Sequence, residues 1–443
     1  MSHSLLWGDL HNHNAVGYAR GSLERAIDIA TEHLDFFSFT GHAQWHDMPR
    51  MPQDAHMKWV KGFEVMRAAW PDVQRQIQAA NRRDDFTAFL GYEWHSSRFG
   101  DYCLYYPDDE GDLVYADHIA ELKAHARSEQ ALLIPHHPAY KRGVRGIDWR
   151  YLDLDLSPVA EIYSEHGASE RDRGPYPFIR HSNGGRWTGN TVQSGLAEGL
   201  RLGIVASTDD HLGYPGAYGE GLMGIWAGSN TRTDILEAIK SRRTYGVTGD
   251  RIKLWFQIND ASMGAELPFC EKRRIAVDVE GWDEIDRIEL VKRNRVVRRS
   301  FPVDQEPLTA TGPWPERVRV RIQYGWGPWA DLGMARIADW DLSASLSEGT
   351  ITAYVPCFQS GPFDEDRRDR VIERDEQTIR WQSFTSRRQA FAEDPTKAML
   401  LEVAAPGDAQ LTITARRQVH ESVPGGCEIT CQLSDLVDRN RIA

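Results

Sequence analysis

The first 249 residues alternate short apolar runs with amphipathic stretches, and this alternation limits the fold more than any other feature of the sequence. A strand is expected at residues 5–9, then a helix capped by Ser22 with apolar positions at helical spacing, then a strand at 36–40. Further strands are expected at 86–92, 103–106, 131–135, 159–163, 203–207 and 222–226, and further helices near 118–129, 191–201 and 232–242. Repeated units of this kind indicate a parallel sheet or barrel, and seven or eight strands suffice to close a barrel.

From about residue 250 the apolar residues recur at every second position instead. They are Ile275, Val277 and Val279 in one stretch and Val318, Val320 and Ile322 in another. This period is typical of antiparallel strands with one buried face. With 443 residues the chain is too long for one ordinary domain, so we predict an α/β domain over residues 1–249 and a β-rich accessory domain, sandwich-like, over 250–443.

Charge and cysteine content narrow the partners and the compartment. The chain has 52 basic and 65 acidic residues, a net charge of −13 that repels nucleic-acid backbones, so no nucleic-acid partner is expected. Its five cysteines are odd in number, scattered and without a CxxC pair, which suits a reducing cytoplasm. With no apolar leader and no run of about 18 apolar residues, we expect a cytoplasmic protein without a membrane partner.

The strongest chemical signal is the pair His11 and His13 at the end of the first expected strand. Side chains two apart on a strand share a face, so both imidazoles can bind one metal ion. The pair alone is weak evidence, because surface or core histidines produce the same pattern. Other potential ligands follow later strands, however: His42, Glu93, Asp101, His137, Asp209 and His211. The carboxyl ends of strands converge on one rim of a barrel, so these residues are expected to meet there.

The donor types indicate which metals would bind. Imidazole nitrogens and carboxylate oxygens without thiolates suit zinc, manganese or iron. A carboxylate that bridges two cations is the usual way to hold them close together, and Glu93 is the candidate bridge.

Five motifs, in this order, resemble the PHP (polymerase and histidinol phosphatase) superfamily over residues 5 to about 248. They are Asp9-Leu10-His11-Asn12-His13, Thr40-Gly41-His42, Gly91-Tyr92-Glu93, His137-Pro138 and Asp209-Asp210-His211. The β-rich region resembles the C-terminal extension of a branch that includes carbaryl-type carbamate hydrolases. The resemblance implies a distorted barrel of about seven strands, two or three divalent cations and phosphoesterase chemistry.

Carried over by position, the resemblance assigns the ligands to three metals. His11, His13, Glu93 and Asp209 would hold the first, Glu93 and His137 the second, and His42 and His211 the third. The sequence departs from the family at Arg20, which cannot bind a cation and stands where an acidic residue or histidine is usual.

That departure leaves the third metal open. Arg20 would then bind a substrate anion, and His42 and His211 would serve as acid or base. Asp101, a second departure, adds an oxygen ligand that favours manganese or iron over zinc.

Several residues stay open between structural and functional roles. His136 is expected in the core or behind the ligands, because adjacent strand residues face opposite ways. Glu161 is a candidate support for the ligands, and Glu165 with His166 could line the mouth of the site. The arginines of residues 171–186 could bind an anionic substrate or belong to a solvated loop. The insertion at 44–85, with Trp45 and Trp59, is read as helix packed on the barrel.

The hypothesis is a hydrolase that uses a metal-activated water on an ester-type bond, with a phosphoester first. A carboxylic or carbamate ester hydrolase is the alternative, and a non-catalytic, metal-stabilised binding scaffold is the alternative of another class. No GxSxG elbow or P-loop is present in the sequence. The expected partner is a small-molecule ester or phosphoester, and a homo-oligomer is left open.

Overall fold

The computed structural model describes residues 3–81, 86–178, 185–302, 308–309, 312–326, 337–358, 365–386, 395–419, 424–437 and 439–443. Two compact units are formed: Met1–Gly281 with Leu290–Arg298, and Trp282–Glu289 with Arg299–Ala443. The strands just after residue 250 pack with the first unit. The domain boundary expected between residues 249 and 250 therefore stays a prediction. No helix in the described ranges is long and apolar enough to cross a membrane.

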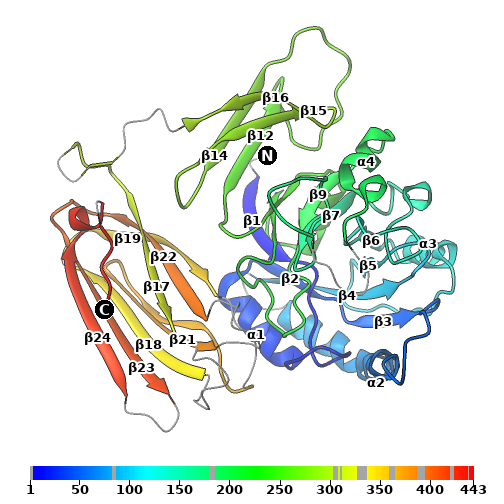
Figure 1. Ribbon diagram of the computed structural model, residues 1–443, viewed down its shortest axis with the longest axis horizontal. Coiled ribbons are helices and arrows are strands. Elements are labelled where there is room, and N and C mark those ends of the chain that lie inside the picture. The colour runs from blue at the N-terminus through cyan, green and yellow to red at the C-terminus, as the bar shows by residue number, and fades with distance from the viewer. Residues whose placement is uncertain are drawn as a thin grey trace. The chain divides into compact units, whose positions relative to one another are not determined.

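The first unit is built on an eight-stranded sheet in the order β11-β10-β1-β2-β4-β5-β6, with β3 beside β4 (Figure 1). Its strands are β1 Ser4–Asp9, β2 Phe36–Phe39, β3 His42–Trp45, β4 Thr87–His95, β5 Tyr102–Tyr105, β6 Leu132–Pro135, β10 Leu222–Ala227 and β11 Thr244–Val247. A second sheet holds β8 Gly167–Ala168, β7 Val159–Ser164 and β9 Gly203–Ala206. The α/β character and the expected strands are confirmed, whereas β3, β8 and β11 were not foreseen.

The expectation of a parallel sheet or barrel holds only in part, because the sheet is mixed. β1, β2 and β4 run parallel, but β4 with β5, β5 with β6, β1 with β10 and β10 with β11 are antiparallel. For β4 and β5 the reason is their short connection, since a parallel crossover needs a dozen or more residues.

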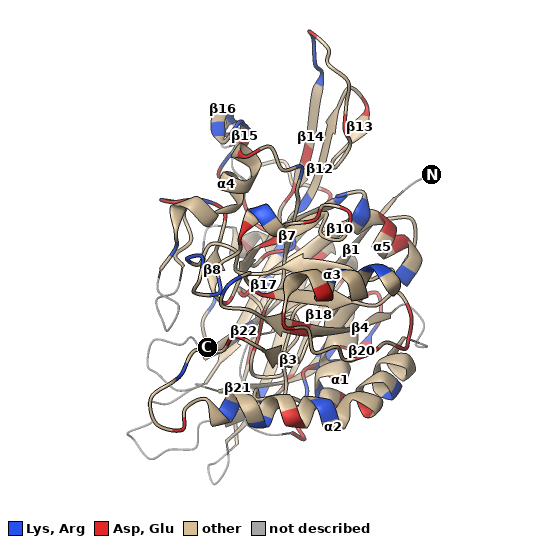
Figure 2. Ribbon diagram, turned by 90° about the vertical axis from the view of Figure 1, so that its right-hand side faces the viewer, with Lys and Arg blue, Asp and Glu red and all other residues tan. Residues whose placement is uncertain are grey.

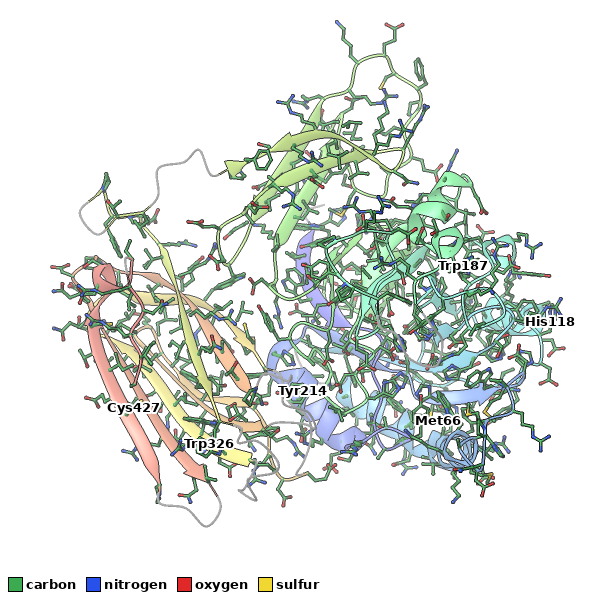
Figure 3. All side chains as sticks on the ribbon, viewed as in Figure 1. Met66, His118, Trp187, Tyr214, Trp326 and Cys427 are labelled. Carbon is green, nitrogen blue, oxygen red and sulfur yellow. The ribbon has the colours of Figure 1, made fainter. Side chains whose placement is uncertain are left out.

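The helices of the first unit are α1 Leu23–His33, α2 Met57–Ala80, α3 Ile119–Ser128, α4 Val192–Ala197 and α5 Arg232–Lys240. The predicted cap is confirmed, since the Ser22 side chain accepts a hydrogen bond from Arg25 N. The insertion forms the single long helix α2, which buries Met66, Trp70 and Ile77 in the core and carries acidic and basic residues along its length (Figures 2 and 3). α4 is shorter than expected and ends just before Gly199, whose φ is +93°.

The strands after residue 250 confirm the period of two, but the apolar side chains that were expected to form a buried face are not buried in every strand. β12 Lys253–Ile258, β13 Ala261–Ser262 and β14 Ile275–Glu280 form one small sheet, and β15 Ile288–Lys292 pairs with β16 Arg295–Ser300. Ile275 and Val277 are each 40% exposed. Their alternation therefore marks a strand whose apolar side chains remain accessible.

The second unit is antiparallel β structure, as expected. One sheet contains β17 Val318–Gly325, β22 Thr396–Ala404 and β19 Thr350–Cys357; the other contains β20 Arg370–Arg374, β21 Thr378–Ser386, β18 Ile337–Leu346, β23 Gln410–Val419 and β24 Gly425–Gln432. Along β17, buried Ile322 and Tyr324 alternate with exposed Arg321 and Gln323. The full sandwich stays a prediction.

A buried ion pair joins the two sheets of this unit. Nζ of Lys397, on β22, lies 2.6 Å from Oδ2 of Asp369, and both side chains are 0% exposed. The Ser383 hydroxyl donates to Asp369, and Tyr324 donates to Ser383 over 2.9 Å. The ammonium also lies 3.9 Å from the centre of the Phe384 ring. Every charge in this group therefore has a partner, which is what makes its burial tolerable.

We expect Lys397→Met to lower the free energy of unfolding by about 3–5 kcal/mol, because the substitution leaves the Asp369 carboxylate buried without its cation. Urea denaturation followed by tryptophan fluorescence measures this. The double variant Lys397→Met with Asp369→Leu should recover most of the loss, and Lys253→Met, at a half-exposed position, should change stability by less than about 0.5 kcal/mol. A single variant as stable as the parent would contradict the assignment.

Candidate metal centre

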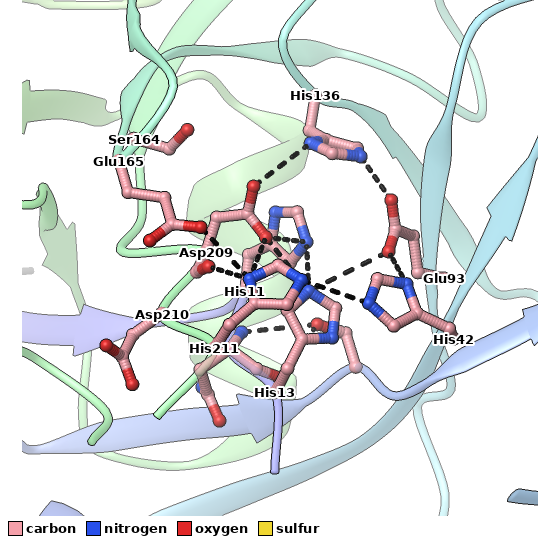
Figure 4. A network of polar contacts seen from close by, with 12 residues as sticks. His11, His13, His42, Glu93, His136, Ser164, Glu165, Asp209, Asp210 and His211 are labelled. Carbon is pink, nitrogen blue, oxygen red and sulfur yellow. Dashed lines mark hydrogen bonds and ion pairs between the residues drawn. The ribbon is translucent and has the colours of Figure 1, made fainter. Parts of the chain in front are cut away.

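The ends of six strands deliver ionisable side chains to one place in the first unit (Figure 4). His11 and His13 follow β1, His42 opens β3 directly after β2, and Glu93 lies near the end of β4. The other contributors are Asp101 before β5, His136 and His137 after β6, and Asp209 and His211 after β9. All eight predicted metal ligands are thus brought together, and groups of them place their ligand atoms within 4.8 Å of one another. Metal ligation itself stays a prediction.

The first predicted ligand set converges most closely. Nε2 of His13 lies 3.1 Å from Nε2 of His11 and 2.9 Å from Oδ1 of Asp209, and Nε2 of His11 lies 3.3 Å from the same oxygen. Oε2 of Glu93 is 3.7 Å from Nε2 of His13. Three side chains therefore turn lone-pair atoms toward one point, which is the arrangement a cation needs.

Glu93 occupies the position expected of a bridge between two cations. Its Oε2 lies 2.6 Å from Nδ1 of His42 and 3.3 Å from Nε2 of His95, while Oε1 contacts Nε2 of His136. Although burial alone would raise it, the pKa of Glu93 is held well below its usual range by His95, His136 and His42. The carboxylate is ionised, and its two oxygens face different groups of imidazoles.

His136 lies inside the cluster, contrary to the expectation that it faces away. Besides its contact with Glu93, its Nδ1 lies 4.0 Å from Oδ2 of Asp209. His137 also faces inward, with Nε2 3.4 Å from Oδ2 of Asp101. Alternation fails here because both residues lie beyond the end of β6, where His137 adopts a φ of +31°.

His95 and Arg145 belong to the site and were not assigned from the sequence. Nδ1 of His95 lies 2.9 Å from Oδ2 of Asp101, and Nε of buried Arg145 donates to the same oxygen over 2.7 Å. Despite burial, Arg145 and His95 hold the pKa of Asp101 well below its usual value. His95 could have been found, because it stands two residues after Glu93 on the same strand face. Arg145 lies in an irregular segment without a periodic signal.

Side chains behind the ligands fix the orientation of the imidazoles. Oε2 of Glu161 lies 3.1 Å from Nδ1 of His11, which turns Nε2 of that ring toward Asp209. His166 places Nε2 3.1 Å from Oδ2 of Asp209 and Nδ1 2.7 Å from the Tyr140 hydroxyl. These contacts are the ones that carboxylates and hydroxyls make to metal-bound histidines.

Two of the arginines expected to bind an anion, Arg20 and Arg186, make other contacts. Arg20 is exposed, and its backbone N donates to the His211 carbonyl over 3.1 Å, so its clamp role stays a prediction. Arg186 donates to the carbonyls of Ala168 and Tyr176, which gives it a structural role in the loop. Residues 179–184 of that loop lie outside the described residues. The buried cation beside the cluster is Arg145.

The protonation states suit cation binding. Burial, with His211 nearby, lowers the pKa of His13 to about 3, and burial also lowers the pKa of His42 and of His137 well below the usual value. Metal ions require neutral imidazoles, and these three rings are already in that form. His11 and His211 differ. Although burial opposes it, Cys103, Asp209 and Glu161 raise the pKa of His11 well above its usual value. Glu165, 3.0 Å from Nδ1, likewise raises the pKa of His211 to about 9 against the effect of burial.

Unpaired buried atoms point to cations as the missing partners. Within the described ranges, the Nδ1 atoms of His13, His136 and His137 have no hydrogen-bond partner. Leaving a buried polar atom unpaired costs about 1–3 kcal/mol, so several in one cluster require an explanation. The residues therefore fit divalent cations with nitrogen and oxygen ligands.

Comparison with known proteins gives distant similarities. Residues 217–261 match a family described as a protein of unknown function (DUF3604). An uncharacterized protein of Chlamydia muridarum is 26% identical over 328 residues, covering 67% of this chain and 49% of that protein. One of Chlamydia trachomatis serovar D is 26% identical over 331 residues, with 68% and 49% covered. The chain thus spans about half the length of these curated relatives.

One solved structure aligns along nearly the whole chain. It comes from Bacteroides vulgatus and is described as a two-domain protein containing a predicted PHP-like metal-dependent phosphoesterase. The alignment has a TM-score of 0.35 at 12% identity and covers 97% of this chain and 96% of that one.

Replacement of Glu93 by alanine should remove bound metal, because this carboxylate faces both groups of imidazoles. Metal content after dialysis, measured by plasma mass spectrometry, tests this.

Glu161→Gln should weaken metal binding by about 10–100-fold, since it alters only the orientation of His11. Glu165→Gln, a partly exposed carboxylate outside the ligand set, serves as the control and should keep its metal. Unchanged metal in Glu93→Ala would contradict the assignment of the bridge.

Proposed function

We propose that this chain is a metal-dependent phosphoesterase of the PHP type, with its site at the strand ends of a PHP-like barrel. The observation that carries the proposal is the convergence of imidazole nitrogens and carboxylate oxygens in a buried cluster, where groups of possible ligand atoms lie within 4.8 Å of one another. Bound divalent cations of zinc, manganese or iron would supply Lewis-acid activation of water and of the ester. Polarity, charge state and geometry of the residues are all compatible with that role.

The contacts support two cation positions. His11, His13, Glu93 and Asp209 would hold one, with Glu161 and His166 orienting the first and last of these. Glu93 would share the second with His136, His137 and Asp101, whose charge Arg145 partly balances.

His211 is better suited to proton transfer than to holding a third cation. It is protonated at neutral pH, and its side chain is 26% exposed. An imidazolium beside the reacting group can give its proton to the leaving oxygen of an ester, and Glu165 then stabilises the charged form again. Nε2 of His42 lies 3.2 Å from Nε2 of His211 and, being neutral, can accept a hydrogen bond from it.

A hydrolase of carboxylic or carbamate esters is the second candidate. The aromatic rings of Tyr18 and Trp59 lie beside His42, which is the environment an aryl ester would need. A metal-stabilised scaffold without activity is the third candidate, and it differs from both by holding metal without turnover.

A substrate series separates these candidates. The metal-loaded protein is expected to hydrolyse p-nitrophenyl phosphate or bis-p-nitrophenyl phosphate faster than p-nitrophenyl acetate or an aryl N-methylcarbamate, measured by release of the phenol. Glu93→Ala is expected to be inactive on all of them. Turnover of only the acetate or carbamate would transfer the assignment to the second candidate, and metal binding with no turnover would support the scaffold.

The pH profile tests the role of His211. Because its pKa is raised to about 9, the fraction of protonated His211, and with it kcat/KM, should fall as the pH rises through this value. In Glu165→Gln this decline should begin at lower pH, since the carboxylate that favours the imidazolium is gone. His211→Asn should lack the decline and be slower at neutral pH, whereas His118→Asn, which keeps a helix-capping side chain on α3, should match the parent. A decline that persists in His211→Asn would exclude this residue as the proton donor.

A further inference from the structure

Exposure identifies the side from which a substrate reaches the cluster. His11, His13, Glu93, His137 and Asp209 are buried, whereas the His211 and Glu165 side chains are 26% and 31% exposed. Among the described residues of the cluster, solvent therefore meets the site at His211. A ligand entering there has its remaining atoms next to whatever surrounds this imidazole.

Two aromatic rings lie on that side. The Tyr18 ring is stacked on His42, with centroids 4.1 Å apart and planes 6° apart, and its hydroxyl is 3.3 Å from Nε2 of His211. The Trp59 ring, from the first turn of α2, lies 4.2 Å from Tyr18 and 5.4 Å from His42. Both rings are half-buried, unlike Trp45 next to them, which is 8% exposed.

A cation accompanies these rings. Nζ of exposed Lys58 lies 4.8 Å from the centre of the Tyr18 ring. Aromatic faces beside a positive charge suit a ligand that combines a flat ring with an anionic group. The anion would be drawn toward the ammonium group, and the ring would be held by stacking.

We propose that the substrate carries a planar aromatic group, packed against Trp59 and Tyr18 while its phosphoryl group faces His211. This inference rests on the proposed phosphoesterase function and specifies its substrate class as aryl phosphoesters. Trp59 and Tyr18 then act in positioning, because they hold the organic group and leave the reacting atoms to the cluster.

Paired phosphonates test the proposal without turnover, since their carbon–phosphorus bond is not hydrolysed at an ester site. Calorimetric titration of the metal-loaded protein with phenylphosphonate and methylphosphonate should show about tenfold tighter binding of the phenyl compound, the order expected for stacking of one ring. Trp59→Leu should reduce this preference to about twofold, and Trp59→Phe should restore most of it.

Tyr115→Leu is the matched control. This exposed ring packs on Arg67 of α2, the helix that also carries Trp59, and it contacts none of the cluster imidazoles in the described structure. Its preference for the phenyl compound should equal that of the parent. Retained methylphosphonate binding in Trp59→Leu shows that the variant is folded. Equal binding of the two compounds by the parent, or an unchanged preference in Trp59→Leu, would overturn the aromatic assignment alone. Binding of neither compound would overturn the phosphoesterase proposal along with it.

Discussion

Burial of three carboxylates, Glu93, Asp101 and Asp209, in one water-poor region is the constraint on which the first unit depends. Desolvation by itself would protonate them, yet their pKa values lie well below the usual range because imidazoles and Arg145 surround them. Such a group is stable only when every charge has a partner. The imidazoles supply part of this compensation, and the ligand atoms that remain unpaired define where cations would complete it.

The sheet brings these groups together by a mixed topology. β1, β2 and β4 run the same way, so residues after or near their carboxyl ends share one rim. β5 runs the opposite way, and Asp101 reaches the rim because it precedes that strand. β6 reverses again, which returns His136 and His137 to the same side. A ligand therefore reaches this rim either from the carboxyl end of a strand such as β4 or from the amino end of an antiparallel strand such as β5.

This explains which parts could be predicted. The histidine pair, Glu93 and Asp209 stand next to strands with clear apolar patterns, so a rule about strand ends located them. The same rule assumed parallel strands, and it still placed Asp101 because the start of an antiparallel strand lies at the same rim. Strand alternation could not place His136, because it does not apply past the last residue of β6. Arg145 pairs with Asp101 from an irregular loop 44 residues away, and only the folded chain shows that contact.

The site is asymmetric, and the asymmetry gives it a direction. In its interior, burial lowers the pKa of His13, His42 and His137, and neighbouring cationic groups lower the pKa of Glu93, Asp101 and Asp209. At its exposed edge, Glu165 keeps a proton on His211. A substrate approaching from solvent would thus meet an acid first and the cation ligands behind it, with Tyr18 and Trp59 beside the acid. Because the leaving group of an ester must point away from the attacking side, this order places the proton donor and the aromatic rings together at the leaving group.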